Sequence, residues 1–145
     1  ICNDILYNTV FFWKFRKQLF ITPNIHTLGF VDTSSDYFKE IIAKVTWQIY
    51  PSSSEASASS VVLGMRNGLI PIISKECTVD TGGFGTVLPD NSVNTIESHV
   101  VDASKKSTED NRERSKNIIQ YSQEKFNEKA FIDSFDNALN NVLAN

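Results

Sequence analysis

A single carboxylate in a serine-rich loop is the feature of the sequence with the clearest chemical potential. Glu55 follows Pro51 and three serines that end at Ser54, and it precedes a run of small residues: Ala56, Ser57, Ala58, Ser59 and Ser60. A carboxylate accepts strong hydrogen bonds from hydroxyl groups. Small side chains let a ligand approach the backbone, and the free N–H groups of a helix start favour an anion. The segment therefore predicts a site for a sugar and a diphosphate, although Glu55 as a solvated or helix-capping acid is the alternative.

The elements around this loop would place it at one edge of a sheet. Trp47–Tyr50 predicts a strand that Pro51 ends, and Ser59–Asn67 predicts a helix closed by a left-handed Gly68. Leu69–Ile73 is fully apolar, as buried parallel strands are, with Pro71 expected where the strand begins to pair. Ligands of open α/β sheets bind beyond the carboxyl ends of the strands, which is where Glu55 would lie.

The rest of the chain alternates between helical periods and short β-branched runs. Before the serine-rich loop, we expect a helix over 5–20, a strand over 24–30 and a helix opened by a capping box at Thr33–Asp36. After the second strand, we expect a loop over 75–85 and a strand over 86–88. A helix capped by Asn91 or Ser92 follows, and the chain is helical from Thr108 with a break near Asn127. This alternation predicts an α/β fold with a Rossmann-like parallel sheet flanked by helices, in one domain over residues 1–145.

Apolar spacing indicates which face of each helix is buried. The expected buried residues are Tyr37, Phe38, Ile41, Ile42 and Val45 in the second helix, Val93, Ile96 and Val100 in the helix after 92, and Phe131, Phe135, Leu139 and Val142 in the last. The aromatic first helix is expected to be a core helix. If its partners were absent, its exposed surface would favour self-association.

The spelling and order of these motifs resemble the donor-binding domain of group 1 (family 4) glycosyltransferases. The segments that carry the resemblance are PSSSE, the helix ending in Met65, NGLIPIIS, the upstream NIHTLGFVD, and Ser74, Asp80 and Gly85–Leu88. The resemblance covers nearly the whole chain from about Asn24. It implies the C-terminal half of a two-domain GT-B fold, cut before its own first strands and without the acceptor-binding half. Because the first residue is Ile1 and not Met, we expect the chain to begin inside a longer protein or an incomplete reading frame.

The resemblance also implies roles for individual residues. Glu55 would touch the transferred sugar, and the small residues after it would meet the diphosphate. Gly29, Phe30 and Val31 would lie near the base, and Lys75 and Glu76 fall in a loop on the predicted ligand side. No metal or other cofactor is implied, because helix-start amides and basic side chains bear the diphosphate charge in this fold. The donor would be a nucleotide-sugar, and the acceptor, a sugar or glycoconjugate, would bind the absent half.

One departure keeps other functions open. The family's second acid, which contacts the donor ribose, would fall at Leu63, which accepts no hydrogen bond. The alternatives are a degenerate glycosyltransferase-like domain that binds protein partners, a nucleotide-sugar epimerase of the same fold, or an unrelated flavodoxin-like binding module.

Composition restricts the remaining classes. The net charge of −3 and the absence of a clustered basic patch argue against nucleic-acid binding. Cys2 and Cys77 form no CxxC pair and no Cys/His cluster, so we expect free or buried thiols and no zinc site. No apolar run reaches the length of about 20 residues that spans a bilayer. We expect a cytoplasmic protein, which in full length could lie peripherally on a membrane.

Overall fold

The computed structural model describes residues 9–144, apart from the side chains of Thr9 and Phe11. The chain forms two compact units, residues 1–44 and residues 45–145. The expected positions 5–8 of the first helix, and Cys2, lie outside the described residues.

The second unit is built on a parallel three-stranded sheet in the order β1-β2-β3. Its strands are β1 (Trp47–Tyr50), β2 (Ile70–Ser74) and β3 (Thr86–Leu88), close to the predicted bounds. Every residue of the central strand β2 is buried. Pro71 fits because β3 begins to pair only at Ile72, so the missing N–H of the proline falls where β3 has not started.

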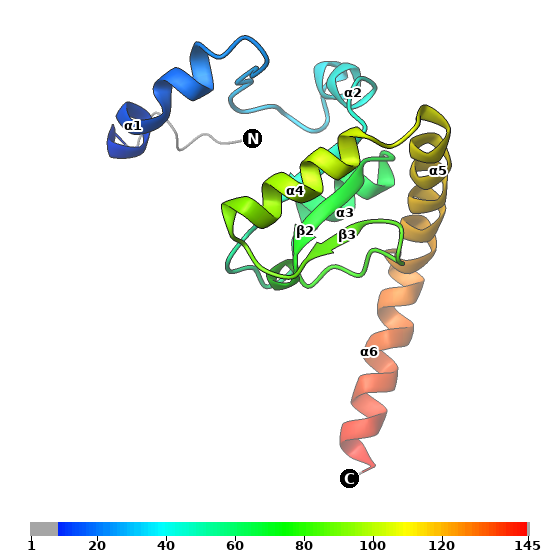
Figure 1. The fold of residues 1–145 in the computed structure, drawn as a ribbon. Helices are drawn as coiled ribbons and strands as arrows, with labels where there is room; N and C mark the ends of the chain where they lie inside the picture. The colour runs from blue at the N-terminus through cyan, green and yellow to red at the C-terminus, as the bar shows by residue number, and fades with distance from the viewer. Residues whose placement is uncertain (1–8, 145) are drawn as a thin grey trace. The chain divides into compact units, whose positions relative to one another are not determined.

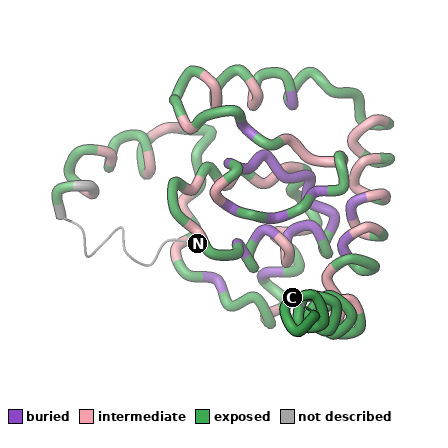
Figure 2. The backbone as a smooth tube through the Cα atoms, turned by 90° about the horizontal axis from the view of Figure 1, so that it is seen from below, coloured by how far each residue is buried: buried purple, intermediate pink, exposed green. Residues whose placement is uncertain are grey.

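Helices cover both faces of this sheet, which confirms the predicted α/β class. Figure 1 shows α4 (Val93–Ser104) in front of the strands and α3 (Ser59–Arg66) behind them. Ile73 packs into a core with Met65 of α3 and Ile118 of α5 (Thr108–Lys125). Its neighbour Ile72 points to the other face and packs with Leu88 and Ala103. Figure 2 shows the buried residues concentrated in these central layers.

Two glycines explain how α3 fits its neighbours. Gly68 has φ 85° and ends α3 in the left-handed conformation, as predicted, and its carbonyl accepts from Ser115 Oγ at 2.8 Å. A Cβ on Gly64 would overlap the Gln48 side chain, whose Nε2 donates to the Val61 carbonyl at 2.9 Å. The close approach of α3 to β1 therefore requires a glycine at position 64.

The first unit contains α1 (Thr9–Phe20) and α2 (Asp36–Ile42). The predicted strand over 24–30 is wrong, because residues 25–32 adopt no regular structure. A strand needs a neighbour for its N–H and C=O groups, and the three described strands pair only with one another. The predicted capping box is also displaced: Ser35, not Thr33, caps α2 by accepting from Phe38 N at 3.1 Å. Asp32 Oδ1 accepts from Ser34 N, so a turn delays the helix start.

The predicted buried face of α2 is only partly correct. Phe38 is buried, and Ile41 and Ile42 are half-buried. Tyr37 and Val45 are exposed. Tyr37 lies about 100° around the helix from Phe38, and Val45 follows the end of the helix.

The helices of the second unit begin at or near the predicted positions, but not all of the predicted buried residues are buried. Ser92 caps α4, and Asn127 caps α6 (Glu128–Leu143) after the predicted break. Val93 is 76% exposed because it begins α4, whose packing on β3 comes from Ile96 and Ala103 further along. The predicted buried face of α6 is wrong: Phe131, Phe135, Leu139 and Val142 are all exposed. Figure 2 shows α6 exposed along nearly its whole length, so no described element covers its apolar stripe.

Candidate functional site

The candidate site lies where the strands of the second unit end. β1 ends at Tyr50 and β2 ends at Ser74, and the two strands run in parallel. The loops that follow them, 51–58 and 75–85, therefore leave the same edge of the sheet. The first of these loops carries Glu55, and the second carries Lys75 and Glu76.

Glu55 is half-buried, and its side chain is held by Tyr50, the last residue of β1. The Tyr50 hydroxyl donates to Glu55 Oε1 at 2.7 Å. This hydrogen bond, followed by burial, raises the pKa of Tyr50 above its ordinary value, whereas a hydrogen bond with Ser60 opposes the shift. Tyr50 is therefore a neutral donor at physiological pH. It orients the carboxylate and leaves Oε2 without a hydrogen-bond partner among the described residues.

Hydrogen bonds to backbone carbonyl groups anchor the loop that carries Glu55. Ser74 Oγ and Asn91 Nδ2 both donate to the Ser52 carbonyl, the latter at 3.2 Å. The Cys77 thiol donates to the Tyr50 carbonyl at 3.2 Å, and Thr78 Oγ1 donates to the Ala56 carbonyl at 2.8 Å. These bonds join the loops after β1 and β2, so the position of Glu55 depends on the fold of both.

The segment after Glu55 divides between ligand-accessible and structural positions. Ser54, Ala56, Ser57, Ser59 and Ser60 are exposed. Ala58 is 2% exposed and belongs to the core, and its N–H donates to the Cys77 carbonyl at 3.3 Å. Ala58 is the N-cap of α3 and has no side chain that caps the helix. The Ser59 N–H donates to the Ser57 carbonyl at 2.9 Å, so the start of α3 is formed by small residues of which Ser60 keeps its backbone N–H without a hydrogen-bond partner among the described residues.

Lys75 and Glu76 begin a short 3₁₀ helix, Lys75–Cys77. Lys75 is exposed, and its Nζ lies 3.9 Å from Glu76 Oε1, an ion pair of little energetic weight at an exposed position. Glu76 Oε2 lies 3.5 Å from Asn91 Nδ2. Lys75 therefore remains available to an anionic ligand, while Glu76 is tied to the loop framework.

Asn91 and Thr78 are site residues that sequence reasoning missed. Asn91 was expected only as a possible helix cap, yet its amide joins the loops after β1 and β2, and its Oδ1 is buried without a partner among the described residues. Thr78 has φ 53°, a left-handed conformation that is rare for a β-branched residue. No sequence signal marks either role, since both depend on segments distant in sequence.

Gly29, Phe30 and Val31 belong to the first unit. Gly29 has φ 69°, Phe30 is 70% exposed and Val31 is buried. Residues 25–32 adopt neither a strand nor a turn, so the positive φ of Gly29 is that of a single left-handed residue in an irregular segment. The proximity of these residues to a nucleotide base stays a prediction.

Cys77 is a free, buried thiol. Within residues 9–144, no three His, Cys, Asp or Glu side chains gather closely enough to hold a metal ion. None of the helices in the described part of the chain is long and apolar enough to cross a bilayer.

Comparison with protein-family models gave no match to this chain. No curated protein and no solved structure matches it either. The fold and the site by themselves define an α/β protein with a candidate ligand site at the carboxyl edge of a parallel sheet.

Proposed function

We propose that this chain is the donor-binding part of a glycosyltransferase that transfers a sugar from a nucleotide-sugar to an acceptor, in polysaccharide or glycoconjugate synthesis. The observation that carries the proposal is the oriented Glu55 carboxylate, which stands at the carboxyl edge of the sheet directly before the open start of α3. A carboxylate beside a helix start suits a ligand that joins hydroxyl groups to a diphosphate.

Different residues of the chain would bind the sugar and the diphosphate. Glu55 Oε2 would accept a hydrogen bond from a hydroxyl of the transferred sugar. The backbone N–H of Ser60, with the positive end of α3, would receive the diphosphate, and Lys75 would add a positive charge. This electrostatic stabilisation of the leaving diphosphate is the contribution the chain would make to transfer. The acceptor would bind a separate half, and the location would be cytoplasmic.

A second candidate function is a glycosyltransferase-like domain that has lost catalysis and binds protein partners. Leu63 favours it, because this half-buried residue on α3 occupies the place where the resemblance requires an acid for the ribose. Without that acid, donor affinity would fall, since a buried hydrogen bond to a charged group contributes about 1.5–3 kcal/mol.

The test is binding of UDP- and GDP-sugars, and of UDP and GDP alone, to the 145-residue chain, followed by amide chemical shifts. We expect shifts at residues 54–60 and 75–83. Glu55→Gln should weaken binding of the nucleotide-sugar roughly tenfold. It should leave binding of the bare diphosphate unchanged, because Glu55 touches only the sugar.

Glu97→Gln is the matched control, since Glu97 is exposed on α4 and the substitution removes the same charge. A folded sample without shifts at millimolar ligand would contradict donor binding and favour the second candidate. Equal weakening of sugar-linked and bare diphosphates by Glu55→Gln would contradict the role given to Glu55.

A further inference from the structure

The first unit carries a segment with an unusual combination of charge and exposed apolar surface. Between Ile5 and Val31 the sequence contains Lys14, Arg16 and Lys17 but no Asp or Glu, in a chain whose net charge is −3. All three cations are exposed on or along α1. None forms an ion pair with a residue that the structure describes. The positive charge of α1 is therefore not neutralised within this part of the chain.

The same helix exposes large apolar side chains. Val10, Trp13 and Phe20 are 78%, 63% and 51% exposed, and Ile21, directly after the helix, is 69% exposed. The expectation of a core helix is thus wrong for these residues. Large exposed apolar side chains that lie together are typical of a surface that contacts another molecule.

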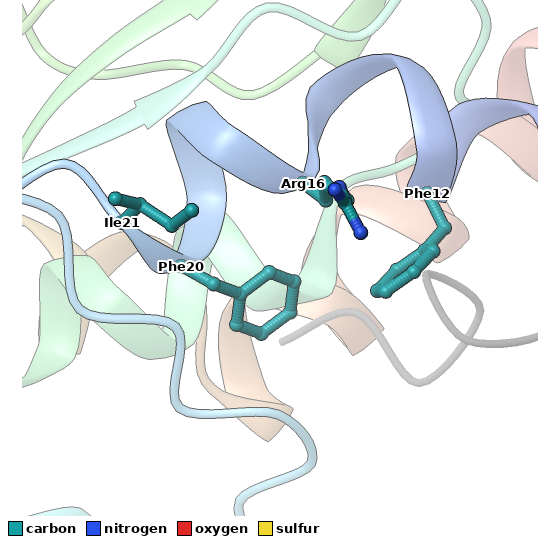
Figure 3. Close-up of a pocket in the computed structure, with 4 residues that line it drawn as sticks. All are labelled: Phe12, Arg16, Phe20 and Ile21. Carbon is teal, nitrogen blue, oxygen red and sulfur yellow. The ribbon is translucent and has the colours of Figure 1, made fainter.

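The cations and the apolar side chains are interleaved rather than separated. Figure 3 shows Phe12 and Phe20 pointing to the same side of α1 with Arg16 between them, and these residues with Ile21 line an open pocket. The Arg16 guanidinium also lies 4.8 Å from the centre of the Trp13 ring, and Lys14 Nζ lies 5.2 Å from that of Phe15. A long cationic side chain among apolar groups can keep its charge at a polar boundary while its stem stays in apolar surroundings.

We propose that α1 binds the surface of an anionic lipid bilayer, with Trp13, Phe20 and Ile21 inserted at the level of the headgroups and Lys14, Arg16 and Lys17 on lipid phosphates. Helices that lie at the membrane surface use exposed aromatic and aliphatic side chains together with Lys or Arg that attract anionic lipids, and α1 exposes both kinds of side chain. Aromatic rings are also enriched at the boundary between hydrocarbon and water. The proposal concerns the first unit and does not depend on donor binding by the second.

Other occupants fit the surface less well. A second copy of α1 would bring three cations against three cations with no carboxylate on either helix to pair them. A nucleic acid would satisfy the charges but would leave aliphatic side chains such as Val10 and Ile21 in water. An anionic bilayer satisfies both the charge and the apolar surface.

The test is sedimentation of the 145-residue chain with vesicles of phosphatidylcholine alone, and of phosphatidylcholine with one quarter phosphatidylglycerol. We expect binding to the anionic vesicles, a weakening with salt, and a blue shift of tryptophan emission that Trp13→Phe reduces. The variant Lys14→Gln/Arg16→Gln/Lys17→Gln should weaken binding on the order of 100-fold, about fivefold for each cation.

Matched variants on the second unit separate this surface from general charge and hydrophobicity. Lys106→Gln/Lys116→Gln/Lys129→Gln removes three exposed cations elsewhere and should leave the affinity within about threefold, because none of them belongs to the proposed contact surface. Phe20→Ser/Ile21→Ser should abolish binding, whereas Phe131→Ser/Ile132→Ser on α6 should not. Equal binding to neutral vesicles, equal loss in both triple variants, or α1-dependent oligomers without vesicle binding would overturn the proposal. Circular dichroism of each variant establishes that it is folded.

Discussion

Tyr121 lies on α5 and packs against the loop after β2. Its ionisation makes the stability of this contact depend on pH. Its ring contacts the place where a Cβ on Gly82 would stand, and it stacks edge-on with Phe84 and Phe126 at 6.1 and 6.4 Å. Burial, then the hydrogen bond with Asp80, raises the pKa of Tyr121 to about 12. Because the unfolded chain loses this proton near pH 10, the stabilisation is complete below pH 10 and is lost as pH rises to about 12.

We therefore expect the free energy of unfolding to fall between pH 10 and pH 12, with a smaller fall in Tyr121→Phe. Urea denaturation at pH 8 and at pH 11 measures both. Tyr50, whose pKa is also raised, contributes in the same direction in both proteins and so serves as an internal reference. An equal fall in the two proteins would show that Tyr121 ionises in the native state as it does in the unfolded chain.

At the scale of elements, the contact of α3 with β1 at Gly64 gives a further prediction. Gly64→Ala should destabilise the protein by about 1–2 kcal/mol, because overpacking costs about 1–3 kcal/mol and better helix propensity returns up to about 1. The added Cβ would displace the Gln48 side chain and break its bond to the Val61 carbonyl.

A double-mutant cycle with Gln48→Ala isolates this overlap. Removal of the Gln48 side chain should relieve it, so Gln48→Ala/Gly64→Ala should be less destabilised than the sum of the two single variants. Additivity of the two single effects, measured by urea denaturation, would contradict the overlap as the cause.

The elements that the sequence predicted well are those whose limits are set locally. Pro51 ends β1, Gly68 ends α3, and Ser92 and Asn127 cap α4 and α6, each through its own backbone preference or side chain. Glu55 was likewise placed at a strand end by local signals. The predictions that failed depend on which elements pack together. Residues 24–30 have a sequence typical of a strand but no neighbouring strand to pair with. Phe131 and Phe135 share a face of α6 that no described element covers. Spacing reveals which residues share a face, not whether anything packs against it.

At the scale of the whole molecule, stability should come from the layers around the sheet and not from α6. Ile118 on α5 is fully buried in the core with Met65 and Ile73, so Ile118→Ala should cost about 2–5 kcal/mol. Phe135 on α6 is 58% exposed, so Phe135→Ala should change stability by less than about 0.5 kcal/mol. Thermal or urea denaturation compares the two, and a large loss in Phe135→Ala would mean that α6 is covered in solution.

The strand register has a consequence for the order in which the second unit forms. Trp47 pairs with Ile70 and Ile72 pairs with Thr86, so each ladder closes a short stretch of chain with α3 or the glycine-rich loop between its ends. Closing a loop of this length has a small entropic cost. Contacts between residues close in sequence therefore form early. Both ladders include β2, so each of the two pairings needs this strand. The folding nucleus would therefore be centred on β2 and α3, and the anchoring of the Glu55 loop by Ser74 and Cys77 would follow directly from the step that closes the first ladder.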